Sequence, residues 1–162
     1  NHKFATAMHV TPDQKDHPVM RGVKDMHAMA GAYSARPMPN STILATNRVL
    51  ESMEVGAKPI ADKAPQPAAW VRTYQLEGGK EGRAFCSTQG ASEDIQSEGV
   101  RRMIVNATLW CMAMEDQISA DSDVSFVGPY YPTTFSFNPS IKDARPEDVA
   151  GWGTPILQGK KD

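Results

Sequence analysis

The fold of this chain is decided by residues 66–114, which read QPAAWVRTYQLEGGKEGRAFCSTQGASEDIQSEGVRRMIVNATLWCMAM. Between residues 68 and 74, apolar and polar side chains alternate, so that Val71 lies on one face while Trp70 and Arg72 lie on the other. Side chains that alternate with a period of two are typical of a β-strand. The stretch therefore predicts a strand with one face toward a core.

A glycine-rich turn follows this strand. Residues 77–82 contain three glycines, and glycine readily adopts the positive φ angles that a tight reversal requires. Residues 83–88, with the sequence RAFCST, are rich enough in β-forming side chains to return as a paired strand. We therefore expect a β-hairpin from Ala68 to Thr88.

The period of the apolar residues changes after residue 89. Acidic and small residues at 89–94 suit a loop before a helix N-terminus, and we expect a helix from Ser97 to Met112, with Arg102 on its outer side. Val105 is expected to widen the apolar stripe. The stripe repeats at steps of three and four, which is typical of a helix packed on a sheet: Val100, Met103, Ile104, Ala107, Trp110, Cys111 and Met114.

The composition excludes some classes of protein. The chain has 162 residues, and its 17 basic against 19 acidic side chains give a net charge of -2. That balance provides no positive patch for nucleic acid or for an anionic membrane. The longest apolar run, residues 103–114, is too short to span a bilayer. We therefore expect one globular core, with no nucleic-acid partner and no membrane partner.

The two cysteines, Cys86 and Cys111, cannot form a disulfide framework and lack the spacing of a zinc or redox site. Free cysteines are usually interior, so we expect two buried thiols. Neither residue is flanked by the glycines of a nucleophile elbow. The sequence therefore predicts no glutaminase or other thiolate chemistry.

The remaining segments are shorter. Residues 7–10 predict a short strand, residues 17–23 a helical turn, residues 41–46 a buried strand beside the hairpin, and residues 123–127 a terminal strand. From residue 128 to 162, recurring proline and glycine exclude long regular elements. This segment predicts an extended tail that lies on a surface, because it keeps several aromatic residues.

Four segments together resemble a known family: HPVMRGV at 17–23, PAAWVRTY at 67–74, GRAFCST at 82–88 and GVRRMIVNATLW at 99–110. In this order and with compatible gaps they are similar to the ThuA-like, or trehalose-utilisation, domain. The resemblance covers about residues 1–127, which form the first predicted domain, with the tail as a separate extension.

The resemblance implies an α/β fold, the flavodoxin-like three-layer sandwich of the class I glutamine amidotransferase-like superfamily. The first βα units of such a fold have no counterpart in this sequence. The chain is therefore expected to be the C-terminal part of a ThuA-like domain, from a truncated gene product or an incomplete sequence. The alternative is a self-sufficient α+β domain, since a chain of this length can bury a core.

The resemblance also suggests where a ligand binds. In open α/β sheets, ligands bind beyond the carboxyl ends of strands, and the second hairpin strand ends near residue 89. Asp94 in the following loop is expected either to cap the helix or to hold a sugar hydroxyl. Two polar positions of the family are replaced here, by Gly31 and Ala91. The candidate substrate-binding residues are His2, Tyr33, Gln89 and Asp94.

Two classes of function remain open. The first is a carbohydrate-related protein that binds or converts a sugar or keto-sugar, as the resemblance implies. The second is a degenerate, non-catalytic module for binding or assembly, which the two replaced polar positions favour. If part of the sheet is missing, an exposed strand edge is expected to promote self-association. The sequence identifies no cofactor, no metal site, no catalytic residue and no compartment.

Overall fold

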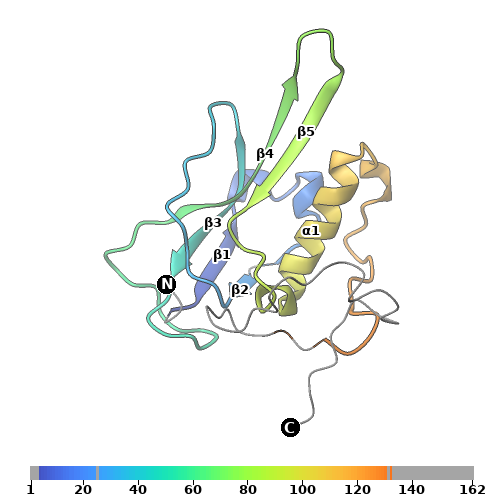
Figure 1. Cartoon of the computed structure of the whole chain (residues 1–162). Coiled ribbons are helices and arrows are strands. Elements are labelled where there is room, and N and C mark those ends of the chain that lie inside the picture. Colours follow the sequence, from blue (N-terminus) through green and yellow to red (C-terminus); the bar gives the residue numbers. More distant parts are fainter. Residues whose placement is uncertain (1–3, 25, 131, 133–162) are drawn as a thin grey trace, which may run out of the picture.

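The computed structural model describes residues 4–24, 26–130 and 132, which form one sheet with one long helix (Figure 1). Four one-turn 3-10 helices lie in the connections, η1 (Pro12–Gln14), η2 (Pro18–Met20), η3 (Asp94–Gln96) and η4 (Glu115–Gln117). The regular elements are β1 (Thr6–Val10), β2 (Met26–Ala28), β3 (Thr42–Val49), β4 (Gln66–Gln75), β5 (Glu81–Ser87) and α1 (Glu98–Cys111).

The sheet is antiparallel throughout its five strands, in the order β2-β1-β3-β4-β5. The predicted flavodoxin-like three-layer sandwich is therefore wrong. A parallel sheet needs a crossover helix between neighbouring strands, whereas antiparallel neighbours need only short loops. Here α1 follows the last strand of the sheet and connects no two strands.

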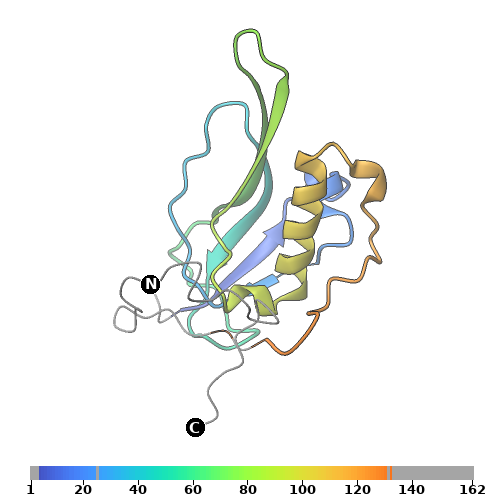
Figure 2. The same ribbon diagram turned by 45° about the vertical axis from the view of Figure 1, so that its right-hand side comes forward.

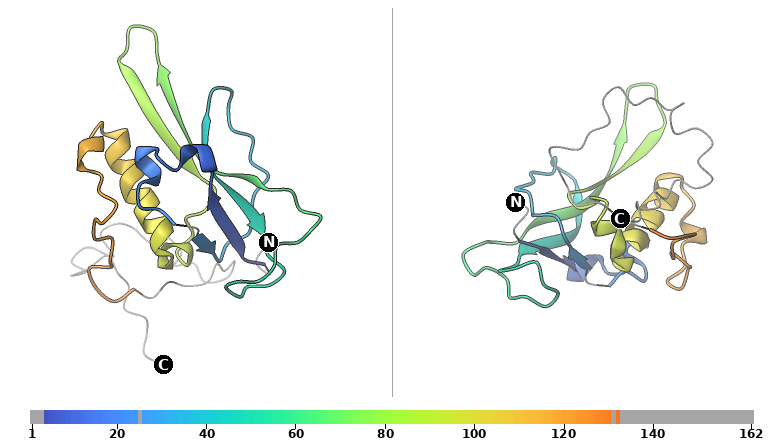
Figure 3. Two further views of the ribbon diagram at one scale, coloured as in Figure 1. Left: turned by 180° about the vertical axis from the view of Figure 1, so that it is seen from behind. Right: turned by 60° about the horizontal axis from the view of Figure 1, so that its bottom comes forward.

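The sheet curls into a half-barrel, which is seen most clearly from behind and from below (Figure 3). Its register shifts twice where β3 meets β4, between Ile43 and Ala45 and between Ala45 and Thr46. An irregularity of this kind bends a strand and increases its twist. The long β4–β5 hairpin projects beyond the rest of the molecule (Figure 1).

The helix α1 covers one face of this sheet (Figure 2). Fully buried side chains of the helix, such as Val100 and Met103, meet Leu44 of β3 and Ala69 and Val71 of β4 in one core. Removal of these apolar surfaces from water is the main force that holds the layers together. No helix covers the opposite face within the described part of the chain.

The predicted hairpin and helix are confirmed, with bounds that differ by one or two residues. The predicted strand at residues 41–46 is confirmed as part of β3, and it lies beside β4. The strand predicted at residues 7–10 is confirmed as part of β1, and residues 18–20 of the predicted helical turn form η2. Strand β2 was missed, because its three residues are too few for their alternation to be recognised as a strand in the sequence.

The helix differs from its predicted pattern at two positions. Arg102, expected outside, is only 7% exposed because it pairs with Glu98 one turn earlier and donates to the carbonyl oxygen of Ser122. Val105, expected to widen the apolar stripe, is 41% exposed. The chain after α1 returns along the helix and packs against the side that carries Arg102, a side that the helical pattern alone assigns to solvent.

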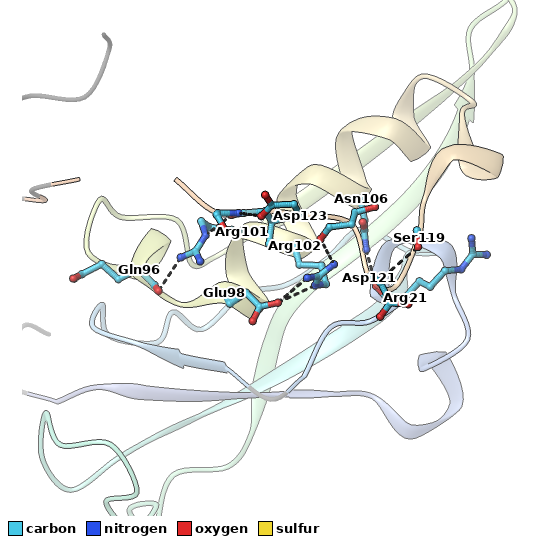
Figure 4. Close-up of polar contacts among 12 residues, drawn as sticks. Arg21, Gln96, Glu98, Arg101, Arg102, Asn106, Ser119, Asp121 and Asp123 are labelled. Carbon is cyan, nitrogen blue, oxygen red and sulfur yellow. Dashed lines mark hydrogen bonds and ion pairs between the residues drawn. The ribbon is translucent and has the colours of Figure 1, made fainter. Parts of the chain in front are cut away.

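This returning segment, residues 115–125, is held by side-chain contacts to backbone oxygens (Figure 4). Arg101 donates to the carbonyl oxygen of Val124 at 2.8 Å, and Arg21 donates to that of Ile118 at 2.6 Å. The backbone of residues 123–127 belongs to no strand, so the strand predicted there is absent. The predicted tail falls mainly on residues outside the described part of the chain.

The cysteines also differ from the prediction. Cys86 and Cys111 are both exposed. Cys86 belongs to the face of β5 that no helix covers, and Cys111 is the last residue of α1. The prediction of two buried thiols is therefore wrong: one thiol lies on the uncovered face of the sheet and the other at the end of the helix.

Candidate ligand-binding cleft

A cleft of about 310 Å³ lies at the end of the sheet where β3 ends and β4 begins. It has one wall from the loop after β2, a second wall from the loop between β3 and β4, and a base from the chain entering β1. The lining residues are Phe4, Ala32, Tyr33, Ser34, Val49, Ile60, Asp62, Lys63, Ala64 and Gln66.

The first wall, residues 32–34, is fixed by hydrogen bonds just before it in the chain. The backbone N–H of Ala30 donates to Oδ1 of Asp94 at 2.9 Å, and the hydroxyl of Thr6 donates to the carbonyl oxygen of Ala30 at 2.8 Å. These bonds tie the wall to the loop before α1 and to β1. Of the four predicted site residues, Tyr33 alone lines the cleft within the described part of the chain.

Asp94 is fully buried and has a structural role. In addition to the N–H of Ala30, its carboxylate accepts the backbone N–H groups of Gly90 at 3.0 Å and Ala91 at 3.1 Å. The helix N-cap is Ser97, without a side-chain capping bond. Asp94 therefore does not cap α1 as predicted, and its carboxylate is buried among backbone N–H groups and does not line the cleft. It positions the wall of the cleft instead.

Gln89 is likewise interior, with 3% of its surface exposed. Its side-chain amide donates to the carbonyl oxygen of Gly31 at 3.5 Å and accepts the hydroxyl of Thr88. The rule that ligands bind beyond strand ends applies to parallel sheets, and this sheet is antiparallel. Gln89 consequently supports the cleft from behind, while His2 lies outside the described residues.

The second wall, residues 60–66, was not recognised from the sequence. The N–H of Ile60 donates to the carbonyl oxygen of Val49 at 2.9 Å, and the N–H of Lys63 donates to that of Ile60 at 3.2 Å. The charged side chains of Asp62 and Lys63 are typical of an exposed connection. No local signal distinguishes them from such a connection, because their partner wall is some thirty positions away.

The lining combines apolar and polar groups. The ring of Tyr33 is 66% exposed and the ring of Phe4 is half-buried, while a carboxylate, an ammonium, a hydroxyl and an amide are contributed by Asp62, Lys63, Ser34 and Gln66. Aromatic faces with a few polar groups around them are typical of small-ligand sites. The carboxylate of Asp62 and the ammonium group of Lys63 give the cleft one charge of each sign.

The described residues contain no group of three or more His, Cys, Asp or Glu side chains that could hold a metal ion. Partial burial raises the pKa of the Cys111 thiol, although a hydrogen bond with the backbone of Phe85 and the charge of Arg83 oppose this shift. A raised pKa disfavours the thiolate, which is the reactive form of cysteine. Neither thiol lines the cleft.

No protein-family model matches this chain, and comparisons with curated proteins and with solved structures likewise give no match. In the part of the chain that the structure describes, no helix has the length and apolar character needed to cross a bilayer.

Proposed function

We propose that this chain binds a small carbohydrate, or a related molecule with several hydroxyl groups, in the cleft between residues 32–34 and 60–66. The observation that carries the proposal is the pairing of the exposed ring of Tyr33 with Asp62 and Lys63 in one cleft. An aromatic ring packs against the apolar C–H face of a sugar, while charged and amide groups bond its hydroxyls.

Four sequence segments resemble the ThuA-like, or trehalose-utilisation, domain and first suggested a carbohydrate ligand. Because the sheet is antiparallel, unlike the fold of that family, the proposal is based on the cleft and not on the resemblance. We propose binding rather than conversion, because no general acid and base pair converges on the cleft among the described residues that line it. Asp62 is its single carboxylate in that set, and no described histidine lines it. Glutaminase activity is excluded from the proposal because no thiol lines the cleft among those residues.

The proposal is tested by calorimetric titration of the protein with trehalose, with oxidised disaccharides and with a polyol of similar size. The variant Tyr33→Ala is expected to weaken binding about tenfold, the loss of roughly 1.4 kcal/mol that one stacking contact supplies. The control is Tyr74→Ala, which removes a second exposed tyrosine on the distant hairpin. Equal binding by Tyr33→Ala and the parent, or no binding of any sugar, would contradict the proposal.

A second candidate function is assembly with another copy of the chain, and the position of β5 favours it. This seven-residue strand is an edge of the sheet, and an exposed strand edge can pair with another chain. Sedimentation velocity over a hundredfold range of protein concentration separates the two candidates. A single monomeric species at every concentration rules out assembly. A dimer whose formation is unchanged by added sugar supports it.

A further inference from the structure

A second concave site, which we call the hairpin groove, lies on the face of β4 and β5 that α1 does not cover. Its volume is about 260 Å³, and one side is formed by the loop between β2 and β3. The lining residues are Arg36, Pro37, Met38, Ser41, Trp70, Arg72, Ala84 and Cys86. None of these residues lines the carbohydrate cleft, so the two sites are separate.

The register of the hairpin forms the floor of this groove. Trp70 is paired with Cys86 across the strands, and Arg72 is paired with Ala84. The small side chain of Ala84 leaves space beside the guanidinium and the indole ring. Met38 closes the groove from the loop, where its sulfur accepts an N–H from Arg72 at 3.1 Å.

The charge in the groove has one sign. Arg36 and Arg72 are its two ionised side chains among the described lining residues, and no carboxylate lines it. Within the described chain, other arginines form ion pairs with carboxylates, Arg83 with Glu115 and Arg102 with Glu98. A thioether is a weak acceptor for a guanidinium, so Arg72 retains most of its capacity to bind an anion.

We propose that the hairpin groove binds a small organic anion that carries an aromatic or other apolar ring. Arg36 and Arg72 bind its carboxylate or phosphate, since a guanidinium matches the planar geometry of these groups. The ring of the ligand packs on Trp70, between the apolar side chains of Pro37 and Met38. A volume just below the roughly 300–1,000 Å³ of drug-sized sites suits one ring with its acid group.

The groove contains its own reporter, because Cys86 is exposed and lines it. In the Cys111→Ser background, a disulfide reagent reacts with Cys86 as the one remaining thiol of the chain. Phenyl phosphate and benzoate are expected to slow this reaction in a saturable way. Benzyl alcohol, which has the ring without the charge, is expected to leave the rate unchanged.

The deciding variant is Arg36→Gln. Arg36 is an exposed loop residue without a hydrogen bond or ion pair in the described structure, so its replacement leaves the fold intact. We expect the half-protecting concentrations of phenyl phosphate and benzoate to rise about tenfold, the effect of losing one charge-assisted hydrogen bond. Lys80→Gln, at the exposed tip of the same hairpin, removes an equal charge and is expected to have no effect.

Four results would overturn the proposal. The first three are the absence of saturable protection by either anion, equal protection by benzyl alcohol, and unchanged protection in Arg36→Gln. The fourth is equal weakening of protection in Arg36→Gln and Lys80→Gln, because general electrostatic attraction would then explain the binding.

Discussion

The two faces of the sheet differ in what covers them. On one face, α1 closes over Ala69 and Val71 of β4 and produces a continuous apolar core. On the other face, the neighbouring residues Trp70 and Arg72 of the same strand line an open groove. Because side chains alternate along a strand, one sequence segment serves stability on one side and is available for ligand binding on the other.

The largest expected effect separates these faces directly. Met103 is fully buried on the covered face, so Met103→Ala is expected to lower the free energy of unfolding by about 2–5 kcal/mol through lost burial and a residual cavity. Cys86→Ala on the open face is expected to change it by less than about 0.5 kcal/mol. Urea denaturation of both variants measures the difference, and equal losses would refute the contrast between the faces.

The next effect tests how the returning segment is packed on the covered side. Gly22 has a φ of 71°, and a Cβ there would lie 2.5 Å from the carbonyl oxygen of Ala120. Gly22→Ala is therefore expected to displace residues near 120 as well as strain its own backbone. Thermal unfolding is expected to show a loss clearly above the roughly 1–2 kcal/mol that the left-handed conformation costs alone.

The matched control is Gly56→Ala. Gly56 has a φ of 84°, but a Cβ at this position would have no neighbouring atom within 4 Å, so only the backbone cost applies. The two alanine variants share the conformational penalty, and their difference isolates the contact with Ala120. If the two losses are equal, that contact contributes nothing to the packing of the segment.

The smallest expected effect is a pH dependence of the free energy of unfolding, caused by a histidine that packs against α1. His17 lies beside Trp110, with ring centroids 5.6 Å apart, and its Nδ1 accepts the N–H of Val19. Burial, and then the charge of Arg83, lower the pKa of His17 below its usual 6.5, although Glu115 partly opposes this. The folded protein therefore binds this proton less readily than the unfolded chain does.

The sign of the effect follows from that difference in proton binding. Stability is fully present above about pH 6.5, and it falls as the pH drops toward the lowered pKa of the folded state. The urea midpoint of the parent is expected to decrease between pH 7.5 and pH 5.5, within about the range in which histidine titrates. His17→Asn keeps a capping oxygen and is expected to flatten this slope. An unchanged slope would show that other groups cause it.

The sequence predicted the hairpin and the helix well because each is a local pattern. Alternation in β4, the glycine-rich turn and the three-to-four spacing of α1 all concern residues within a few positions of one another. The parallel architecture, which the resemblance to the ThuA-like domain implied, was wrong. The strand pattern could not correct it, because the period of a strand is the same whether its neighbour runs parallel or antiparallel. Only the pairing of distant segments distinguishes the two.

The candidate site shows the same division. Tyr33 was predicted and lines the cleft, whereas Gln89 and Asp94 were predicted as ligand contacts and hold the backbone of residues 30–31 from behind. A polar residue in a loop before a helix is compatible with either role. Which role it takes depends on what packs against the loop, and here that is a segment 58 to 64 residues earlier in the chain.

The sequence by itself therefore determined the strands of the hairpin, the extent of α1 and the apolar stripe that joins them, because periodicity records which side chains need to leave water. Tertiary structure decided the antiparallel order, the burial of Arg102, the cleft and the groove. Each of these depends on contacts between segments far apart in the chain, and a backbone N–H or a charged side chain carries no local mark of the distant partner that satisfies it.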